Sequence, residues 1–139
     1  MCYARNVGVQ PVLTGSLLAI YPFSAKSGLR RIPVSSGSSE LGLSNPDDLS
    51  FFPTGRHIVV SNQDLDTAVI VAVDPLTGAL GKQCGTLVNP DAQLSYPHGT
   101  AVSRDGQYLA IANYGHDKLT IYALRTGISQ NARRVAKAS

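Results

Sequence analysis

One histidine in this sequence lies where a side chain could act on a substrate. His98 follows Tyr96 and Pro97 and precedes a short apolar run, "GTAVS" (99–103), which predicts that it lies at the start of a strand. A histidine at such a position can act as a general base on a water molecule. The alternative is that Pro-His-Gly only leads the chain into the strand.

Two carboxylates occupy the corresponding place earlier in the chain. Asp47 lies 51 residues before His98, with Asp48 beside it. If the two segments are neighbours in the fold, an Asp and a His would approach each other and could share a proton or a substrate hydroxyl group. We therefore take His98 as the candidate catalytic residue, and Asp47 and Asp48 as candidate substrate-binding residues. An Asp at this position can instead bond to nearby backbone amides.

The residue types that bind metals or phosphate form no recognisable site. Cys2 and Cys84 fit no metal-ligand spacing, and the three histidines fit no zinc spacing. The segment "TGALGKQ" (77–83) contains Gly and Lys but lacks the spacing and the Ser or Thr of a phosphate-binding loop. We expect neither a metal nor a cofactor, and we expect both thiols to be reduced.

A second polar pattern, Asn-x-x-x-Asp, occurs twice. It places Asn62 before Asp66, and Asn113 before Asp117. Recurrence favours a structural role, because an active site is normally made once. We predict that these side chains satisfy backbone groups in a turn between two strands.

These pairs belong to a longer internal repeat. Residues 45–73 align with residues 96–124 over 29 positions without a gap, at a constant offset of 51. Apolar and turn positions coincide throughout, although few residues are identical. An incomplete earlier copy is visible where residues 24–30 match residues 74–80 at an offset of 50. Self-similarity near this period is the signature of a repeat architecture.

Each copy predicts β-strands joined by tight turns. The second copy predicts three strands, at 99–103, 107–113 and 118–124. Gly106, in the first of its turns, is expected to adopt a backbone conformation that a side chain would strain. Residues 109–112 and 119–124 are apolar at nearly every position, which is typical of a strand buried on both faces. In the first copy, residues 74–80 form a turn that leads into a fourth strand. Four antiparallel strands per repeat describe a blade of a β-propeller, so the predicted fold class is all-β, with propeller blades in an incomplete propeller.

The repeat divides the chain into four parts. We predict a partial blade and linker at 1–44, a complete blade and linker at 45–95, most of a blade at 96–127 and a basic tail at 128–139. The tail is expected to be solvated, which leaves the last blade without a fourth strand. The rest of the chain holds nine basic and nine acidic residues, so the net charge of +3 indicates no nucleic-acid partner. No apolar run approaches the roughly 20 residues of a membrane helix, and we expect no signal peptide.

The segment "PHGTAVSRDGQYLAIANYGHDKLTIY" (97–122) resembles the seven-bladed lactonase propellers, a group that includes propeller-type 6-phosphogluconolactonase. The segment "VDPLTGAL" (73–80) looks like their recurrent Asp-Pro-x-Thr-Gly-x-Leu hairpin. The similarity covers about residues 3–127, which is two to three blades. It implies a propeller that hydrolyses a sugar lactone such as 6-phosphogluconolactone, without a cofactor, with His98 or a carboxylate assisting the attacking water.

Two functions stay open at this point. The leading hypothesis is a lactonase-like propeller segment acting on a small-molecule lactone in the cytoplasm, with neither nucleic acid nor membrane as a partner. The competing hypothesis is a non-catalytic propeller module for binding or scaffolding, or an inactive remnant, because propellers host many unrelated functions. Since its strands expect cover on both faces, the chain is predicted to self-associate or to depend on further blades.

Overall fold

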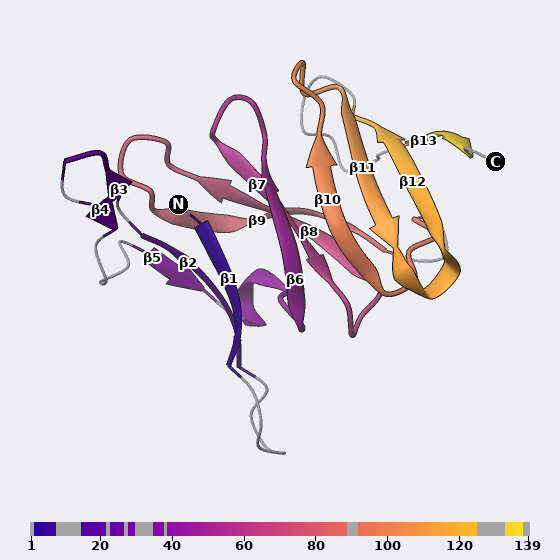
Figure 1. Cartoon of the computed structure of the whole chain (residues 1–139), viewed down its shortest axis with the longest axis horizontal. Coiled ribbons are helices and arrows are strands. Elements are labelled where there is room, and N and C mark those ends of the chain that lie inside the picture. The colour runs from indigo at the N-terminus through magenta and orange to yellow at the C-terminus, as the bar shows by residue number, and fades with distance from the viewer. Residues whose placement is uncertain are drawn as a thin grey trace.

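The computed structural model describes residues 2–7, 15–21, 23–26, 28–29, 35–37, 39–88, 92–124 and 133–137 of the chain. Strands dominate this part, and its helical segments are two single 3-10 turns, η1 (Ser39–Leu41) and η2 (Tyr114–His116). The strands form three sheets that stand side by side, together with one short hairpin (Figure 1). The predicted all-β fold class is therefore confirmed.

The first sheet has three antiparallel strands in the order β1-β2-β5. They are β1 (Cys2–Val7), β2 (Gly15–Ile20) and β5 (Ser35–Gly37). The hairpin of β3 (Phe23–Ser24) and β4 (Gly28–Leu29) lies between β2 and β5 in the sequence. This sheet corresponds to the incomplete copy of the repeat.

The second and third sheets each have four antiparallel strands in sequence order. The second contains β6 (Pro46–Phe51), β7 (His57–Asn62), β8 (Thr67–Val73) and β9 (Leu80–Leu87). The third contains β10 (Pro97–Val102), β11 (Tyr108–Asn113), β12 (Lys118–Ala123) and β13 (Arg133–Lys137). The first three strands of both sheets lie where the 51-residue repeat predicts them.

The strand β13 corrects one expectation. Residues 128–139 were expected to form a solvated basic tail, but Arg133–Lys137 pairs with β12 and supplies the fourth strand of the third sheet. The outer edge of β12 carries backbone groups that need partners, and β13 provides them. Charged residues are common on such edge strands because they oppose aggregation, so the basic composition is compatible with pairing.

The repeat is reproduced in backbone conformation as well as in strand order. Four pairs of residues 51 positions apart share a positive φ angle: Gly42 and Gln93, Asn45 and Tyr96, Gly55 and Gly106, and Asp66 and Asp117. The tight turns share their hydrogen bonds too. The Phe52 N–H donates to the His57 carbonyl at 2.9 Å, and the Ser103 N–H donates to the Tyr108 carbonyl at 2.9 Å. The repeat therefore encodes the same turn geometry twice.

Two apolar cores lie between the three sheets. Residues on opposite faces of the second sheet contribute to different cores, because side chains alternate along a strand. Ile58 and Val60 pack toward Leu18 of the first sheet, whereas Val59 packs toward Leu109 of the third. All five side chains are fully buried. Burying a side chain of this size contributes roughly 1.5–3 kcal/mol, so the second sheet is held from both sides.

The third sheet is covered on one face only. Leu109 and Ile111 of β11 are fully buried against the second sheet, while Tyr108 is 44% exposed and Leu119 is 49% exposed on the opposite face. The burial of both faces predicted for residues 109–112 and 119–124 is therefore wrong, because one face of the third sheet is exposed. We call the uncovered side the open face and define it by the following residues on β11 and β12: Tyr108, Ala110, Ala112, Leu119 and Ile121.

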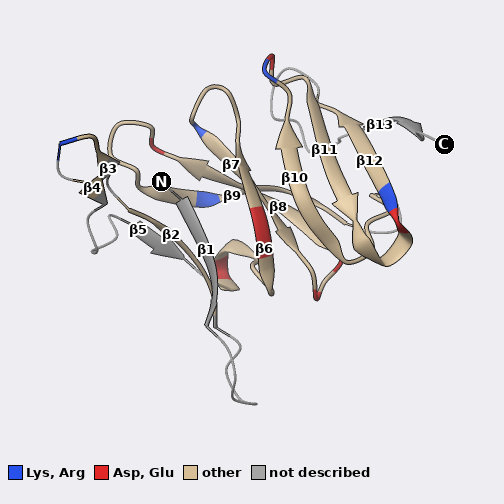
Figure 2. Cartoon of the chain, viewed as in Figure 1, with Lys and Arg blue, Asp and Glu red and all other residues tan. Residues whose placement is uncertain are grey.

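Charged side chains of the described residues lie mainly at turns and strand ends, and leave the sheet faces neutral (Figure 2). Exceptions are an acidic stretch on β6, formed by Asp47 and Asp48, and a basic residue within β9, Lys82. In the part of the chain that the structure describes, no helix has the length and apolar character needed to cross a membrane.

Candidate functional site

The site is built where the first strands of two neighbouring sheets, β6 and β10, lie side by side (Figure 1). Each strand pairs with its partner through an irregular register, between Pro46 and Leu49 in β6 and between Pro97 and Thr100 in β10. An irregularity of this kind changes the direction in which side chains point. The residues between these limits are the three sequence candidates, Asp47, Asp48 and His98, together with Gly99.

Asp47 and His98 meet across the two strands. The Nδ1 atom of His98 lies 2.5 Å from Oδ2 of Asp47, and the two side chains are 51% and 30% exposed. The approach expected from their matching repeat positions is therefore present. A carboxylate on Nδ1 fixes the orientation of the ring and leaves Nε2 as the nitrogen that can accept a proton from water. The His98 backbone is also held, because its carbonyl accepts a hydrogen bond from Ser61 Oγ at 2.8 Å.

Asp48 has a different environment. Its Oδ2 atom accepts hydrogen bonds from the Thr100 N–H at 2.6 Å and from the Thr100 hydroxyl at 3.1 Å. The hydroxyl of Ser50 donates to the Thr100 carbonyl at 2.8 Å. These bonds fasten β6 to β10. The side chain predicted to bind substrate thus already holds the two strands together, which leaves Asp47 as the carboxylate that faces the histidine.

Two tyrosines that the sequence reasoning did not select complete the site. The rings of Tyr96, His98 and Tyr114 lie with centroids 5.9–6.4 Å apart in each pairing. Tyr96 is 42% exposed and Tyr114 is 71% exposed. Large exposed aromatic rings beside a few polar groups are typical of a small-molecule site. The feature of the sequence that could have identified them is the repeat, in which Tyr96 aligns with the polar residue Asn45 and Tyr114 with the polar residue Gln63.

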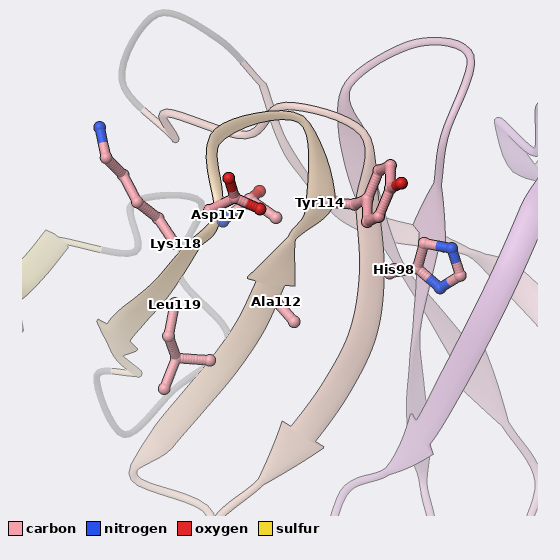
Figure 3. Close-up of a pocket in the computed structure, with 7 residues that line it drawn as sticks. His98, Ala112, Tyr114, Asp117, Lys118 and Leu119 are labelled. Atoms are coloured by element: carbon pink, nitrogen blue, oxygen red, sulfur yellow. The ribbon is translucent and has the colours of Figure 1, made fainter.

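A shallow hollow of about 310 Å³ adjoins the histidine. Six of the residues that line it are His98, Ala112, Tyr114, Asp117, Lys118 and Leu119. Figure 3 shows Ala112 and Leu119 on β11 and β12, with Asp117 and Lys118 at the turn above them. His98 lies across β10, toward the second sheet. The hollow is therefore the upper part of the open face, with the His98 ring at its rim.

The recurring asparagines are structural, as predicted, but the backbone groups that they bind lie outside the turn. The side-chain oxygen of Asn62 accepts from the Ser44 N–H at 3.1 Å, and that of Asn113 accepts from the Ser95 N–H at 3.1 Å. Both serines precede the first strand of a sheet, so these asparagines secure the segment that leads into the sheet. Their Nδ2 groups also donate across the turn between the second and third strands, to the hydroxyls of Thr67 at 3.1 Å and Thr120 at 2.9 Å. The prediction that they satisfy backbone groups of that turn is wrong, because repeat position alone does not show which distant backbone groups need a partner.

Asp66 links two sheets in a similar way. Its Oδ1 atom accepts a hydrogen bond from the Tyr96 N–H at 2.6 Å, across to the start of the next sheet. The acceptor is therefore satisfied outside its own turn, again unlike the prediction. Asp117 repeats the left-handed backbone of Asp66, with φ angles of 48° and 49°, but it lies exposed beside the hollow.

The other two histidines lie away from this arrangement. His57 begins β7 and packs edge-on against the Phe52 ring, with centroids 6.0 Å apart. Desolvation by burial, and then the nearby charge of Arg56, lower the pKa of His57 from its usual value. His116 is exposed in η2. Among the described residues, no three His, Cys, Asp or Glu side chains gather closely enough to hold a metal ion.

Comparison with known proteins gives matches at the level of structure only. No protein-family model matches the chain, and no curated protein matches it. A candidate 6-phosphogluconolactonase from Bacteroides fragilis aligns with 16% identity and a TM-score of 0.69, over 86% of this chain and 32% of that protein. The periplasmic gluconolactonase PpgL from Pseudomonas aeruginosa aligns with 20% identity and a TM-score of 0.67, over 86% of this chain and 33% of PpgL.

A protein from Lactobacillus plantarum aligns with 21% identity and a TM-score of 0.65, over 88% of this chain and 35% of that protein. The chain thus spans about a third of the length of these structures. Identities this low show the fold alone. The predicted resemblance to propeller-type lactonases is confirmed at that level, and the three sheets correspond to blades of an incomplete propeller.

Proposed function

We propose that this chain is a segment of a propeller that hydrolyses a sugar lactone, and that the lactone binds beside His98. The observation that supports this proposal most directly is the 2.5 Å contact between His98 Nδ1 and Asp47 Oδ2 on an exposed strand edge. The fold shared with the gluconolactonase PpgL and with a candidate 6-phosphogluconolactonase is consistent with this substrate class. A six-membered sugar lactone, with or without a phosphate group, is the substrate we infer.

In the proposed reaction, Asp47 keeps the proton of His98 on Nδ1, so that Nε2 is free to accept another. A water molecule attacks the lactone carbonyl carbon while Nε2 removes one of its protons. The tetrahedral intermediate then collapses, the bond from the carbonyl carbon to the ring oxygen breaks, and the imidazolium returns the proton to that oxygen. The product is the open-chain hydroxy acid. The negative charge of Asp47 stabilises the imidazolium that forms between the two steps.

The tyrosines are assigned to substrate binding. The exposed rings of Tyr96 and Tyr114 each offer an apolar face, with ring centroids within 6.4 Å of the imidazole centroid, and the C–H face of a sugar ring can pack on either one. The developing oxyanion needs hydrogen-bond donors. We assign this role to the hydroxyl groups of Tyr96 and Tyr114, whose rings lie beside the imidazole.

The competing function is a non-catalytic propeller module. The hydrogen bonds of Asp48 favour it, because one of the two candidate carboxylates serves to join strands.

The sequence and the comparisons bear differently on the cellular location. A cytoplasmic location stays a prediction, and the similar protein PpgL is periplasmic.

The test is a lactonase assay on the intact chain with glucono-δ-lactone and with its 6-phosphate, corrected for spontaneous hydrolysis. We expect acceleration by the wild type and a loss of about 100-fold or more in His98→Ala, the effect of removing a general base. His116→Ala, which changes an exposed histidine of the same sheet, is the matched control and should retain the activity. Equal rates in the two variants would exclude His98 as the base. A folded wild type without acceleration would favour the non-catalytic module.

A further inference from the structure

One buried hydroxyl group contacts the backbone beside both members of the Asp47–His98 pair. Ser61 lies on β7, and its side chain is fully buried. Its Oγ atom accepts a hydrogen bond from the Asp48 N–H at 3.1 Å and donates to the His98 carbonyl at 2.8 Å. The Asp48 carbonyl is a second and longer acceptor, at 3.3 Å. A single hydroxyl group therefore joins the backbone next to the carboxylate to the backbone of the histidine.

Both of its backbone partners lie in the irregular parts of β6 and β10. At Asp48 and at His98 the register of the first strand against the second is interrupted, so the regular pairing of an antiparallel ladder does not fix these residues. The Ser61 hydroxyl group fixes them instead. Because it is buried, it cannot exchange these partners for water without a cost in free energy.

The repeat shows that an irregular first strand does not itself need this hydroxyl group. The residue 51 positions after Ser61 is Ala112, on β11. The first strand of the third sheet nevertheless has the same irregularity against its second strand as the first strand of the second sheet has. An alanine is therefore sufficient to form the irregular strand. The hydroxyl group of Ser61 serves the contact between the two sheets, at the place where Asp47 and His98 meet.

The contact between Asp47 and His98 depends on the spacing of these two strands. Nδ1 and Oδ2 lie 2.5 Å apart, and a separation about 1 Å larger would end the hydrogen bond. The two side chains are 51% and 30% exposed, so tight packing does not hold them together. Their positions are therefore set by the backbone from which they extend.

We propose that Ser61 is a positioning residue for His98, because its hydroxyl group sets the spacing at which Asp47 keeps the histidine proton on Nδ1. This role rests on the proposed function, in which Nε2 accepts a proton from water. In a neutral histidine, the partner of one ring nitrogen decides which nitrogen carries the proton. Without the carboxylate contact the proton can move to Nε2, and a protonated Nε2 cannot act as the base.

Replacing Ser61 by Ala should leave the sheets folded. Alanine already occupies the equivalent position of the third sheet. The two strands also stay joined, because the Thr100 N–H donates to Asp48 Oδ2 at 2.6 Å and the Ser50 hydroxyl donates to the Thr100 carbonyl at 2.8 Å. The change is therefore confined to the end of the contact where His98 lies.

The experiment measures the tautomer of His98 without any substrate. The intact chain is labelled with ¹⁵N, and a long-range ¹H–¹⁵N correlation spectrum, recorded where the imidazole is neutral, shows which ring nitrogen carries the proton. The spectrum of His98→Ala identifies the His98 signals. We expect the Nδ1–H form alone in the wild type and a mixture of the two forms in Ser61→Ala.

The matched control is Thr100→Val. It removes another hydroxyl group from the same contact between the strands and keeps the N–H group that donates to Asp48. A loss of stability alone would be common to both variants, whereas a change of tautomer should occur only in Ser61→Ala. The wild-type tautomer in Ser61→Ala, the same mixture in both variants, or a mixture in the wild type would each overturn the proposal.

Lactone kinetics provide the second measurement. In Ser61→Ala, kcat should fall about tenfold or more, the effect of a misplaced catalytic group, while KM stays the same. Thr100→Val should keep the wild-type kcat. A change of tautomer in Ser61→Ala, together with a wild type that hydrolyses no lactone, would support the control of His98 by Ser61 and reject the proposed function. Unchanged kcat in a Ser61→Ala variant of an active protein would overturn the positioning role.

Discussion

At the residue scale, the site depends on residues that the repeat places in equivalent positions and then differentiates. Asp47 and His98 lie in the same irregular register of neighbouring strands, and their side chains meet at 2.5 Å. Asp48 is used for joining the strands, whereas its counterpart Gly99 has no side chain. The repeat thus explains why polar side chains lie at the same position of neighbouring strands. The residue type at each position determines whether the side chain joins the strands or faces the solvent-exposed site.

Replacing Asp47 by Asn tests the pairing directly. The amide keeps the size of the side chain and removes the charge that would stabilise an imidazolium. In an active preparation, we expect Asp47→Asn to lower lactone turnover by about tenfold or more with little change in KM. Steady-state kinetics would measure it, beside Asp64→Asn as a charge-matched control. A change confined to KM would instead indicate that Asp47 only contacts the substrate.

The equivalent aspartates Asp66 and Asp117 give a matched pair for stability. Asp66→Gly leaves the Tyr96 N–H without its acceptor, which should cost about 1–3 kcal/mol. Asp117→Gly removes no such bond between sheets in this chain and relieves a left-handed backbone, so it should leave stability unchanged or slightly higher. Urea unfolding followed by circular dichroism would compare them. Equal losses in the two variants would contradict the role of Asp66 as a link between sheets.

At the scale of elements, much of the fold between residues 45 and 124 could be predicted, because apolar runs and Gly-containing turns recur at a fixed offset. Other features depend on contacts between distant segments and could not be predicted. The run Arg133–Lys137 has too little apolar character to indicate a strand, and only its pairing with β12 defines it. Likewise, the partner of Asn113 is Ser95, which the offset alone does not identify.

The turn between β10 and β11 provides a prediction about backbone strain. Gly106 has a φ angle of +71°, where a side chain costs about 1–2 kcal/mol. Gly106→Ala should therefore lower Tm by several degrees. Gly99→Ala is the control, since its new Cβ atom would meet the Ala112 Cβ at an ordinary distance of 3.7 Å without positive φ. Differential scanning calorimetry would show whether the losses differ, and equal losses would argue against backbone strain as the cause.

Two turn aspartates predict how stability depends on acid. The Ser103 hydroxyl and the Gln107 N–H lower the pKa of Asp105, and the N–H groups of Leu76 and Thr77 lower the pKa of Asp74. Because the pKa of each aspartate is lower in the folded state, its charge stabilises the folded protein fully at pH values above the unfolded-state pKa, near 3.8. This stabilisation is lost as the pH falls through the folded value. Tm should therefore decline below about pH 4.

The variant that tests this origin is Asp105→Asn, which cannot ionise but keeps an oxygen acceptor for the turn. Its Tm should change less than that of the wild type between pH 5 and pH 3. A wild type and variant with parallel Tm profiles would place the acid sensitivity elsewhere in the molecule.

At the scale of the whole molecule, the open face of the third sheet implies incomplete burial among the described residues. The second sheet is covered on both sides, and the third is covered on one. An exposed apolar sheet face usually marks an interface or an aggregation liability. The behaviour of the chain in solution should therefore depend on what covers the open face.

We expect the isolated chain to associate at higher concentration or to unfold at a low temperature with weak cooperativity. Leu119→Asp should reduce association, because it places a charge on the open face. Size-exclusion chromatography with light scattering, combined with calorimetry, measures both properties. A monomer at all concentrations with a sharp transition at high temperature would show that the open face needs no cover.

The joints between the sheets have a consequence for how such a molecule can be built. Several of their donors are main-chain N–H groups, at Asn45, Tyr96 and Thr100. Every residue except proline carries this group, so most substitutions at the donor positions leave the joint intact. Blades joined in this way are interchangeable parts. A module copied or exchanged between chains would still fit its neighbours after its side chains had diverged, provided that the few acceptors such as Asp48 and Asp66 were kept.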